Sequence, residues 1–188
     1  LVEIGNQCWF QENLKTANYR NGDAIENIVN SSQWAQTIDG SWCCYDNSCQ
    51  LYDAWGYLYN WFAVNDFRNV CPNGFHVSSK IDWIELETFL GGSAVAGGAI
   101  KTQGTQWWTS PNLADNSSQF YAYPAGQRNA GGYYQEIYEG ANWWTTTVDD
   151  FLPNSYSWMF EVYYSSYELD SGTDPRNMGF SIRCVQDQ

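Results

Sequence analysis

The chain has 188 residues, of which 18% are aromatic, and its formal net charge is −13. With only 8 basic residues against 21 acidic ones, it cannot form the basic patch that nucleic acids or anionic membrane surfaces require, so we expect neither as a partner. No long apolar run occurs, which predicts that no segment inserts directly into a membrane. The length suits one domain with a sizeable core, and we expect residues 1–188 to form it.

The N-terminal residues predict a β-hairpin. Two short apolar runs between Val2 and Phe10 flank Gly5-Asn6, a dipeptide typical of two-residue hairpin turns. The chain begins at Leu1 without an initiator methionine or an apolar leader, so we expect a processed product or an excised domain. Residues 17–50 are polar and rich in turn-forming residues.

A first helix is predicted at residues 53–64. Trp55, Leu58, Tyr59 and Phe62 recur there at i, i+3, i+4 and i+7, the spacing of one helix face. This apolar stripe indicates that the helix packs on the core.

A short strand at 75–77 is predicted to precede a second helix at 80–90. Ser79 is suited to cap this helix, and Asp82, three residues later, completes a variant of the capping box. Gly91-Gly92 is typical of a helix end. We therefore expect a well-delimited helix of about three turns.

The second half of the chain predicts strands. They are expected at 120–123, 133–138, 142–147, 158–163 and 180–184. Phe180, Ile182 and Cys184 alternate, so they are expected to share an inward face of the last strand. Two early helices and a late antiparallel sheet predict an α+β domain.

Six cysteines indicate disulfide bonds. They are Cys8, Cys43, Cys44, Cys49, Cys71 and Cys184. With a single histidine and no Cys-x-x-Cys spacing, a zinc site is disfavoured, and disulfides predict an extracellular or cell-surface location. Cys43 and Cys49 could close a small loop, but Cys44 and Cys8 compete for the same partners.

Several motifs carry a family resemblance. In chain order they are IGNQ-x-W-x-x-ENL at 4–14, GYLYNWFAV at 56–64, CPNGFHV at 71–77, DW at 82–83, F-x-A-x-PAG-x-R at 120–128, WWTT at 143–146 and GFSIRCV at 179–185. From about residue 2 to 187, the chain resembles the Fibrobacter succinogenes major paralogous domain family of secreted and surface proteins in Bacteroidota and relatives.

That family is in turn similar to C-type-lectin-like folds, which include formylglycine-generating enzymes and the variable ligand-binding proteins of diversity-generating retroelements. The resemblance implies a disulfide-stapled C-type-lectin-like fold, in which two helices flank a small twisted antiparallel sheet with long loops and the chain ends meet. It also implies that Cys71 pairs with Cys184, while the pairing of the other four cysteines stays open.

Catalysis is the least expected function. His76 is the only histidine, and its place in a predicted strand favours a buried structural role. The sulfatase-activating relatives hold copper with cysteines of their C-terminal part, where this chain has only Cys184. We therefore do not expect that activity here.

We expect no cofactor, and a bound calcium ion is the weaker alternative. Lectins of this fold can bind sugar through a calcium ion, but their Glu-Pro-Asn and Gln-Pro-Asp triplets are absent here. The remaining candidate ligands are loop acids, for which solvated surface charge is the favoured interpretation: Asp149, Asp150, Asp170 and Asp174.

Adjacent aromatic pairs provide the candidate binding residues. Neighbours in a strand point to opposite faces, so one member of each pair is expected in the core and the other outside, where aromatics stack on sugars or anchor interfaces. The candidate ligand or interface residues are Trp107, Trp108, Tyr133, Tyr134, Trp143, Trp144 and Arg128.

These observations predict a non-catalytic, secreted or cell-surface domain for binding or adhesion. A glycan is the first candidate ligand, and a protein ligand at a surface is another. The alternative is a structural subunit of an extracellular filament or surface layer, in which the partner is another copy of the same chain.

Overall fold

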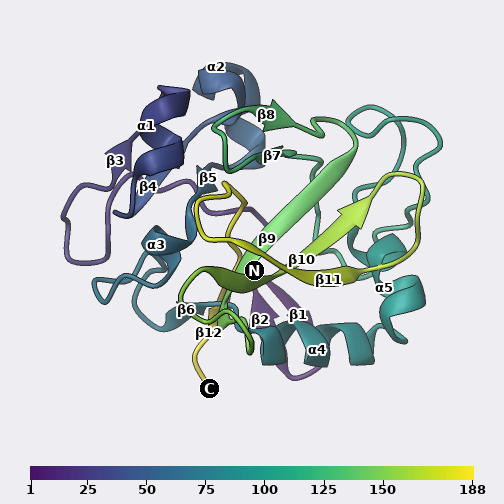
Figure 1. Ribbon diagram of the computed structural model, residues 1–188. Helices are drawn as coiled ribbons and strands as arrows, with labels where there is room; N and C mark the ends of the chain where they lie inside the picture. Colours follow the sequence, from purple (N-terminus) through teal and green to yellow (C-terminus); the bar gives the residue numbers. More distant parts are fainter.

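Short strands form four sheets in the computed structural model, which describes residues 1–188 (Figure 1). The sheets are β1-β2-β12-β6 (Val2–Ile4, Gln7–Trp9, Cys184–Gln186, Phe75–Val77), β11-β10-β9 (Asp170–Pro175, Tyr156–Tyr163, Gly140–Val148), β3-β4-β5 (Glu26–Asn27, Ser41–Cys43, Leu58–Tyr59) and β7-β8 (Gln127–Arg128, Tyr134–Gln135). Only the β3–β4 pair is parallel. The helices are α1 (Ser31–Gln36), α2 (Cys49–Tyr52), α3 (Trp61–Val64), α4 (Lys80–Phe89) and α5 (Ser93–Ile100), with 3₁₀ turns η1 (Tyr45–Asn47) and η2 (Asp53–Trp55). The class is therefore α+β, with several small sheets.

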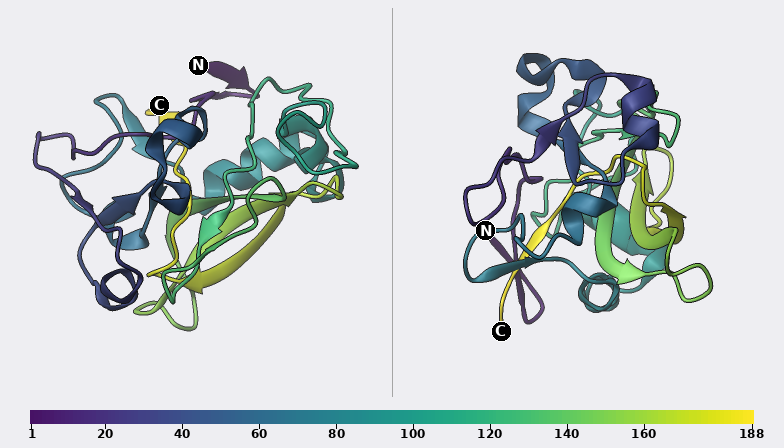
Figure 2. Two further views of the ribbon diagram at one scale, coloured as in Figure 1. Left: turned by 90° about the horizontal axis from the view of Figure 1, so that it is seen from above. Right: turned by 60° about the vertical axis from the view of Figure 1, so that its left-hand side comes forward.

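The predicted N-terminal hairpin is confirmed. Ile4 lies opposite Gln7 across the Gly5-Asn6 turn. β12 pairs with β2, placing Val185 opposite Trp9, and the Gln188 side chain donates to the carbonyl oxygen of Asn6 at 3.3 Å. The two chain ends consequently lie on the same side of the molecule, as the left view of Figure 2 shows.

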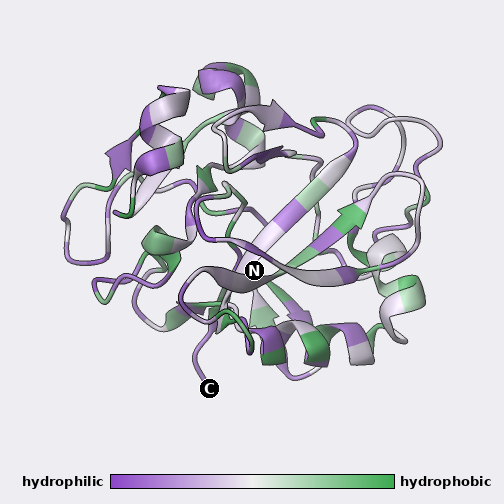
Figure 3. Ribbon diagram, viewed as in Figure 1, coloured by the Kyte–Doolittle hydropathy of each residue, from purple (hydrophilic) through white to green (hydrophobic).

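The predicted helix after Ser79 is confirmed as α4. The Ser79 hydroxyl accepts from the Asp82 amide at 3.3 Å, and the Asp82 carboxylate accepts from the Ser79 amide at 2.7 Å. These two bonds satisfy amides that a helix start leaves without partners. Hydrophobic and hydrophilic residues alternate along α4 (Figure 3), and Trp83 and Leu86 are buried against β9 and β10.

The prediction of one continuous helix at 53–64 is wrong. Gly56 has φ 78°, which ends η2, and β5 and α3 follow. Tyr59 exchanges backbone hydrogen bonds with Phe180 at 2.8 and 3.0 Å, and the Asn60 side chain caps α3 by accepting from the Ala63 amide at 3.1 Å. The apolar spacing matched one helix face, but long-range pairing of Tyr59 with Phe180 satisfies this backbone instead.

Helix α5 was not predicted, because Gly97 and Gly98 disfavour an isolated helix. Its glycines allow close packing. A Cβ atom added to Gly97 would lie 2.0 Å from the carbonyl oxygen of Glu168. Tertiary contact therefore requires glycine at a position where helix propensity alone argues against it.

Three predicted strands are largely irregular. Of residues 180–184, only Cys184 belongs to a strand, β12, and Phe180 forms an isolated bridge with Tyr59. Residues 120–123 form only an isolated bridge, between Ala122 and Lys101, and Tyr121 has φ 55°. At 133–138, only Tyr134–Gln135 is a strand. Strand β11 is polar and was not predicted, since it lacks apolar alternation.

Strands β9 and β10 include the predicted strands at 142–147 and 158–163, and the core lies on both of their faces. Trp143 and Phe160 pack with Trp83 in one buried cluster, while Trp144 and Met159 pack in a second one. The second cluster also contains Phe180, Ile182 and Cys184, so the prediction that these three side chains point inward is confirmed, although only Cys184 lies in β12.

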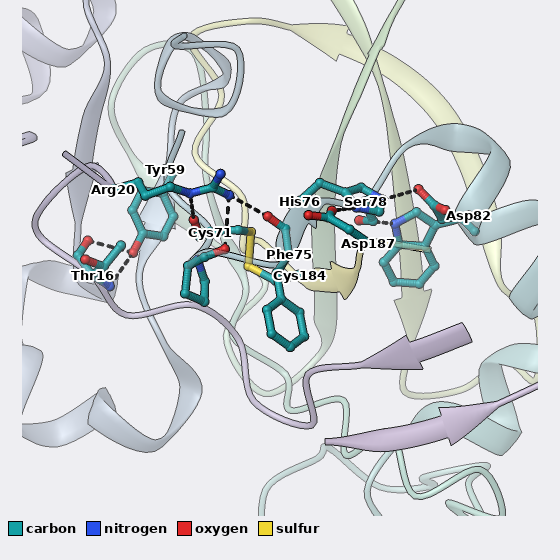
Figure 4. The surroundings of a disulfide bond; sticks show 12 residues. Thr16, Arg20, Tyr59, Cys71, Phe75, His76, Ser78, Asp82, Cys184 and Asp187 are labelled. Carbon is teal, nitrogen blue, oxygen red and sulfur yellow. Dashed lines mark hydrogen bonds and ion pairs between the residues drawn. A yellow bond between two sulfur atoms is a disulfide. The ribbon is translucent and has the colours of Figure 1, made fainter. Parts of the chain in front are cut away.

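Two disulfides are present, Cys71–Cys184 and Cys44–Cys49. The first agrees with the pairing that the family resemblance implies, and its Cα atoms are 5.9 Å apart (Figure 4). The expectation that all six cysteines are bridged is wrong, because Cys8 and Cys43 are free thiols. Cys43 ends β4 with its side chain in a small buried cluster, and burial raises the pKa of its thiol. Its neighbour Cys44 pairs with Cys49.

Candidate ligand-binding surface

Seven aromatic side chains form a continuous series at one end of the molecule, which we name the aromatic track: Tyr45, Tyr52, Trp55, Trp107, Tyr123, Tyr134 and Tyr138. Neighbouring ring centroids are 5.1 Å apart for Tyr134–Tyr45 and Tyr52–Trp55, 5.4 Å for Tyr45–Tyr52 and Trp55–Tyr138, 6.1 Å for Trp55–Trp107 and 6.2 Å for Trp107–Tyr123. All six contacts are tilted or edge-on, the geometries that aromatic rings favour.

The track has a buried base and an exposed rim. Trp55 is buried, whereas 36% of Trp107 and 42% of Tyr138 are exposed. Tyr133, adjacent to the track, is 66% exposed. Large aromatic side chains held partly open in this way are typical of ligand and protein interfaces.

Local backbone and side-chain contacts position the track. The Cys44–Cys49 disulfide spans the turn that presents Tyr45, and α2 lies beside β8 at the upper edge of Figure 1. The Tyr134 hydroxyl donates to the Asn47 side chain at 2.7 Å, which joins these two segments. Three stretches far apart in sequence therefore form one surface.

Half of the non-glycine residues with positive φ lie at the same place. Four non-glycine residues in or beside the track have positive φ: Asp46 (48°), Asn47 (55°), Glu136 (62°) and Tyr138 (66°). For a bulky residue such as Tyr138 this conformation is unfavourable, and it persists because Tyr138 donates to Pro124 O at 3.2 Å and accepts from the Thr109 amide at 2.7 Å. Such strain clusters at functional sites, which makes the track a candidate binding surface.

The electrostatics of the track suit a ligand that accepts hydrogen bonds. Burial raises the pKa of Tyr45, Tyr52 and Tyr134, so these hydroxyls stay protonated, but the single proton of Tyr134 is already donated to Asn47. Asp46 and Glu136 lie near enough to Tyr45 to raise its pKa further. The surface therefore combines aromatic faces with neutral donors and bordering negative charge.

The structure brings only some of the predicted binding residues to this surface. Trp107 and Tyr134 belong to the track, and Tyr133 lies next to it. Trp108 is buried and donates from Nε1 to the Thr102 hydroxyl at 2.8 Å. The pair at 107–108 thus follows the expectation of one inward and one outward ring.

Trp143 and Trp144 are both buried, which corrects the expectation that one of them faces outward. Their strand β9 has core on each face, with Trp83 contacting Trp143 and Phe180 contacting Trp144. A sheet covered on both sides has no outward face, so neither ring can meet a ligand.

Arg128 is also buried, so it does not contact a surface ligand directly. Its guanidinium donates to the carbonyl oxygens of Ile28, Val29 and Gly132 at 2.5, 3.0 and 3.0 Å. The Cζ atom of Arg128 also lies 5.0 Å from the centroid of the Tyr134 ring, a cation–π contact. Arg128 therefore packs against Tyr134 of the track from the protein interior.

Five members of the track were not predicted from the sequence: Tyr45, Tyr52, Trp55, Tyr123 and Tyr138. The available signal was the aromatic density of residues 45–59 and 121–138. Because the residues come from turns, no periodicity identified which rings would be exposed.

The four candidate calcium ligands do not form a metal-binding group. No group of three or more histidine, cysteine or acidic side chains is placed to hold a metal ion. Asp149 instead accepts from the amides of Leu152 and Phe151 at 2.5 and 2.8 Å, which holds the pKa of its carboxyl below the ordinary value. Asp149 therefore orders the β9–β10 turn.

Asp174 on β11 is half-buried, and burial, followed by the charge of Glu136, raises the pKa of its carboxyl from 3.8 to about 6. The folded state therefore binds this proton more tightly than the unfolded chain does, so the charged form destabilises the fold above that pH. We expect Asp174→Asn to raise the free energy of unfolding at neutral pH by about 1 kcal/mol, after allowance for solvent screening.

At about pH 3, below the ordinary pKa of 3.8, the wild type and Asp174→Asn should be almost equally stable, because the carboxyl is then largely protonated in both the folded and unfolded states. Urea titrations at neutral pH and at low pH measure the free energy of unfolding of both proteins. Asp150→Asn, at an exposed position, is the control and should change stability by less than about 0.5 kcal/mol. A stabilisation that persists at low pH contradicts the assignment.

His76 is not buried, which corrects the prediction. Its side chain is 40% exposed and lies between two carboxylates, with Nδ1 2.8 Å from Asp187 and Nε2 3.3 Å from Asp82 (Figure 4). Both ring nitrogens thus have acidic partners. These contacts connect β6 to the C-terminus and to the cap of α4.

Comparison with known proteins gives one match. The family model described as the Fibrobacter succinogenes major domain matches residues 2–186. This range runs from β1 to β12 and includes every residue of the aromatic track. Searches of curated proteins and of solved structures found no match.

Proposed function

The chain belongs to the Fibrobacter succinogenes major domain family, and we propose that this member is a non-catalytic binding or adhesion domain with a C-type-lectin-like fold that contacts a glycan through the aromatic track. The observation that carries the proposal is the continuous, partly exposed series of rings on strained backbone. The two disulfides support an oxidising, extracellular location, either secreted or at the cell surface. No helix is long and apolar enough to cross a membrane.

The proposed contact is stacking of sugar rings on the exposed aromatic rim. Trp107 and Tyr138 both border Trp55 at nearly right angles, 88° and 89°. A ligand on this surface therefore meets a ring face and a ring edge together, with tyrosine hydroxyls as neutral donors. Since Asp46 and Glu136 border the track, neutral glycans are the expected ligands.

Trp107→Ala is expected to weaken binding of a neutral glycan about tenfold, equivalent to roughly 1.4 kcal/mol, because truncating an exposed aromatic anchor removes its stacking surface. A glycan array identifies the ligand, and calorimetry on the wild type and the variant measures the affinities. Phe151→Ala is the control, since Phe151 is 90% exposed but lies in the β9–β10 turn, outside the track.

The proposal fails if no neutral glycan binds the wild type, or if Trp107→Ala binds as tightly as the wild type while keeping its melting temperature. Equal loss in Phe151→Ala also counts against it, because the effect would then not belong to the track. Added calcium should leave the affinity unchanged.

Self-association in a filament or surface layer is the second candidate function. The outer side of α4 exposes Ile81, Ile84 and Phe89, next to a cavity of about 480 Å³ against the N-terminal hairpin. Apolar side chains gathered in this way mark protein interfaces. A strict monomer in sedimentation experiments at high concentration argues against this alternative.

A further inference from the structure

A second concave surface lies outside the aromatic track. Two cavities of about 520 and 240 Å³ share Ile38, Phe62 and Arg176, so together they form one groove with two lobes. None of its lining residues belongs to the track. We name the smaller cavity the Arg176 lobe; its walls come from the end of α1, from α3 and from the turn before β10.

Arg176 is held rigidly, yet its charge is not compensated. Its guanidinium lies 3.9 Å from the centroid of the Trp61 ring, and it donates to the Ser157 hydroxyl at 3.2 Å, to Asn154 O at 3.4 Å and to Pro153 O. These three bonds leave one N–H free on each terminal nitrogen. No carboxylate forms an ion pair with Arg176, although the chain has 21 acidic residues.

The larger lobe differs from the Arg176 lobe in its charged residues. There Arg68 pairs with Asp66 at 2.7 Å and with Asp23 at 3.2 Å, so its charge is neutralised within the protein. Glu26 and Asp39 also line that lobe and add negative charge. Because Arg176 lines both lobes but acidic side chains line only the larger one, an anionic group is favoured in the smaller lobe.

The remaining polar groups of the Arg176 lobe are neutral. They are amide and hydroxyl side chains, and Arg176 is the only charged residue in its lining. Gln36, Asn154 and Ser155 are exposed there, and their side chains make no hydrogen bond within the protein. Phe62 and Ile38 supply an apolar wall. The lobe thus combines one guanidinium, several free hydrogen-bonding groups and one hydrophobic side.

We propose that the Arg176 lobe binds an acidic sugar residue of the hexuronate type. The sugar carboxylate accepts hydrogen bonds from the free guanidinium N–H groups, since arginine pairs with planar carboxylates in this way. The ring hydroxyls bind Gln36, Asn154 and Ser155, and the ring packs on Phe62. The lobe is smaller than the roughly 300–1,000 Å³ of pockets for drug-sized ligands, so a single sugar residue is the ligand it suits.

The inference shares its ligand class, a glycan, with the proposed function, but it concerns a different surface. Substituting Arg176 would also release the turn at Pro153 and Asn154 and could unfold the site. The test therefore uses Gln36→Glu, which places a negative charge at the exposed rim of the lobe and leaves the Arg176 contacts intact. Ser32→Glu is the matched control, because it adds the same charge to exposed α1 outside the groove.

Sodium glucuronate, glucose, acetate and glutamate are titrated into each full-length protein and followed by NMR chemical shifts. We expect glucuronate to bind at least tenfold more tightly than the other three ligands. Gln36→Glu should weaken glucuronate binding at least tenfold, and Ser32→Glu should change it less than twofold. Melting temperatures verify that both variants are folded.

Three results would overturn the inference: glucuronate binding no tighter than glucose, unchanged glucuronate binding in Gln36→Glu, or acetate and glutamate binding as tightly as glucuronate. The last result would indicate a general carboxylate site. Trp107→Ala separates the two proposals, because it should spare glucuronate binding, while Gln36→Glu should spare binding of the neutral glycan. A negative result for one surface therefore does not affect the proposal for the other surface, because the two are measured with different ligands and variants.

Discussion

Replacing Cys71 and Cys184 by alanine is expected to lower the free energy of unfolding by about 5 kcal/mol. This disulfide closes a sequence separation of 113 residues, so its loss restores a large conformational entropy to the unfolded chain. Both cysteines are fully buried, and the bridge joins the segment before β6 to β12 (Figure 4). Urea unfolding of the double variant, followed by tryptophan fluorescence, measures the loss.

The Cys44–Cys49 disulfide is the matched control. It spans a separation of only 5 residues, for which the same entropy argument gives about 2 kcal/mol. Alanine at both positions should therefore cost less than half as much. Equal losses for the two double variants would contradict the loop-length explanation.

Arg183→Leu is expected to destabilise the fold by about 3–5 kcal/mol, because it leaves buried acceptors without a donor. The guanidinium is fully buried and donates to the carbonyl oxygens of Phe10, Phe120 and Tyr121 at 2.6, 2.9 and 3.0 Å, and to the Asn13 side chain at 2.7 Å. One side chain, directly before β12, thus joins the C-terminal segment to the N-terminal segment and to the loop at 120–121. Equilibrium denaturation of the variant tests this.

Arg20→Leu is the control that tests whether burial causes the expected loss of stability in Arg183→Leu. Arg20 also donates to three backbone carbonyl oxygens, those of Cys71, Pro72 and Phe75, but its side chain is exposed. Water can replace its hydrogen bonds, so the expected loss is below about 1 kcal/mol. If both substitutions cost the same, burial is not the cause of the Arg183 effect.

Local signals in the sequence predicted the elements whose stability is local. The Gly5-Asn6 turn, the Ser79–Asp82 capping box and the apolar strands at 142–147 and 158–163 all have their physical cause within a few residues. Helix α5 and the segment at 53–64 were missed because their causes are distant. Gly97 packs against Glu168, and Tyr59 pairs with Phe180.

The binding surface was only partly predictable for the same reason. Aromatic pairing in the sequence identified Trp107 and Tyr134, but it equally indicated Trp143, Trp144 and Trp108, which are buried. Whether a ring is exposed depends on what packs against it. For β9 this is α4 on one side and the segment at 180–184 on the other.

By itself the sequence determined the α+β class, the family, the hairpin, the capped helix α4 and, through the family resemblance, the Cys71–Cys184 pair. Only the tertiary structure decided which cysteine pairs with Cys49, that Arg128 is a buried support, and which rings form the aromatic track. Periodicity and capping depend on neighbours in the chain. Burial, close approach and pairing depend on residues that are distant in sequence and adjacent only after folding.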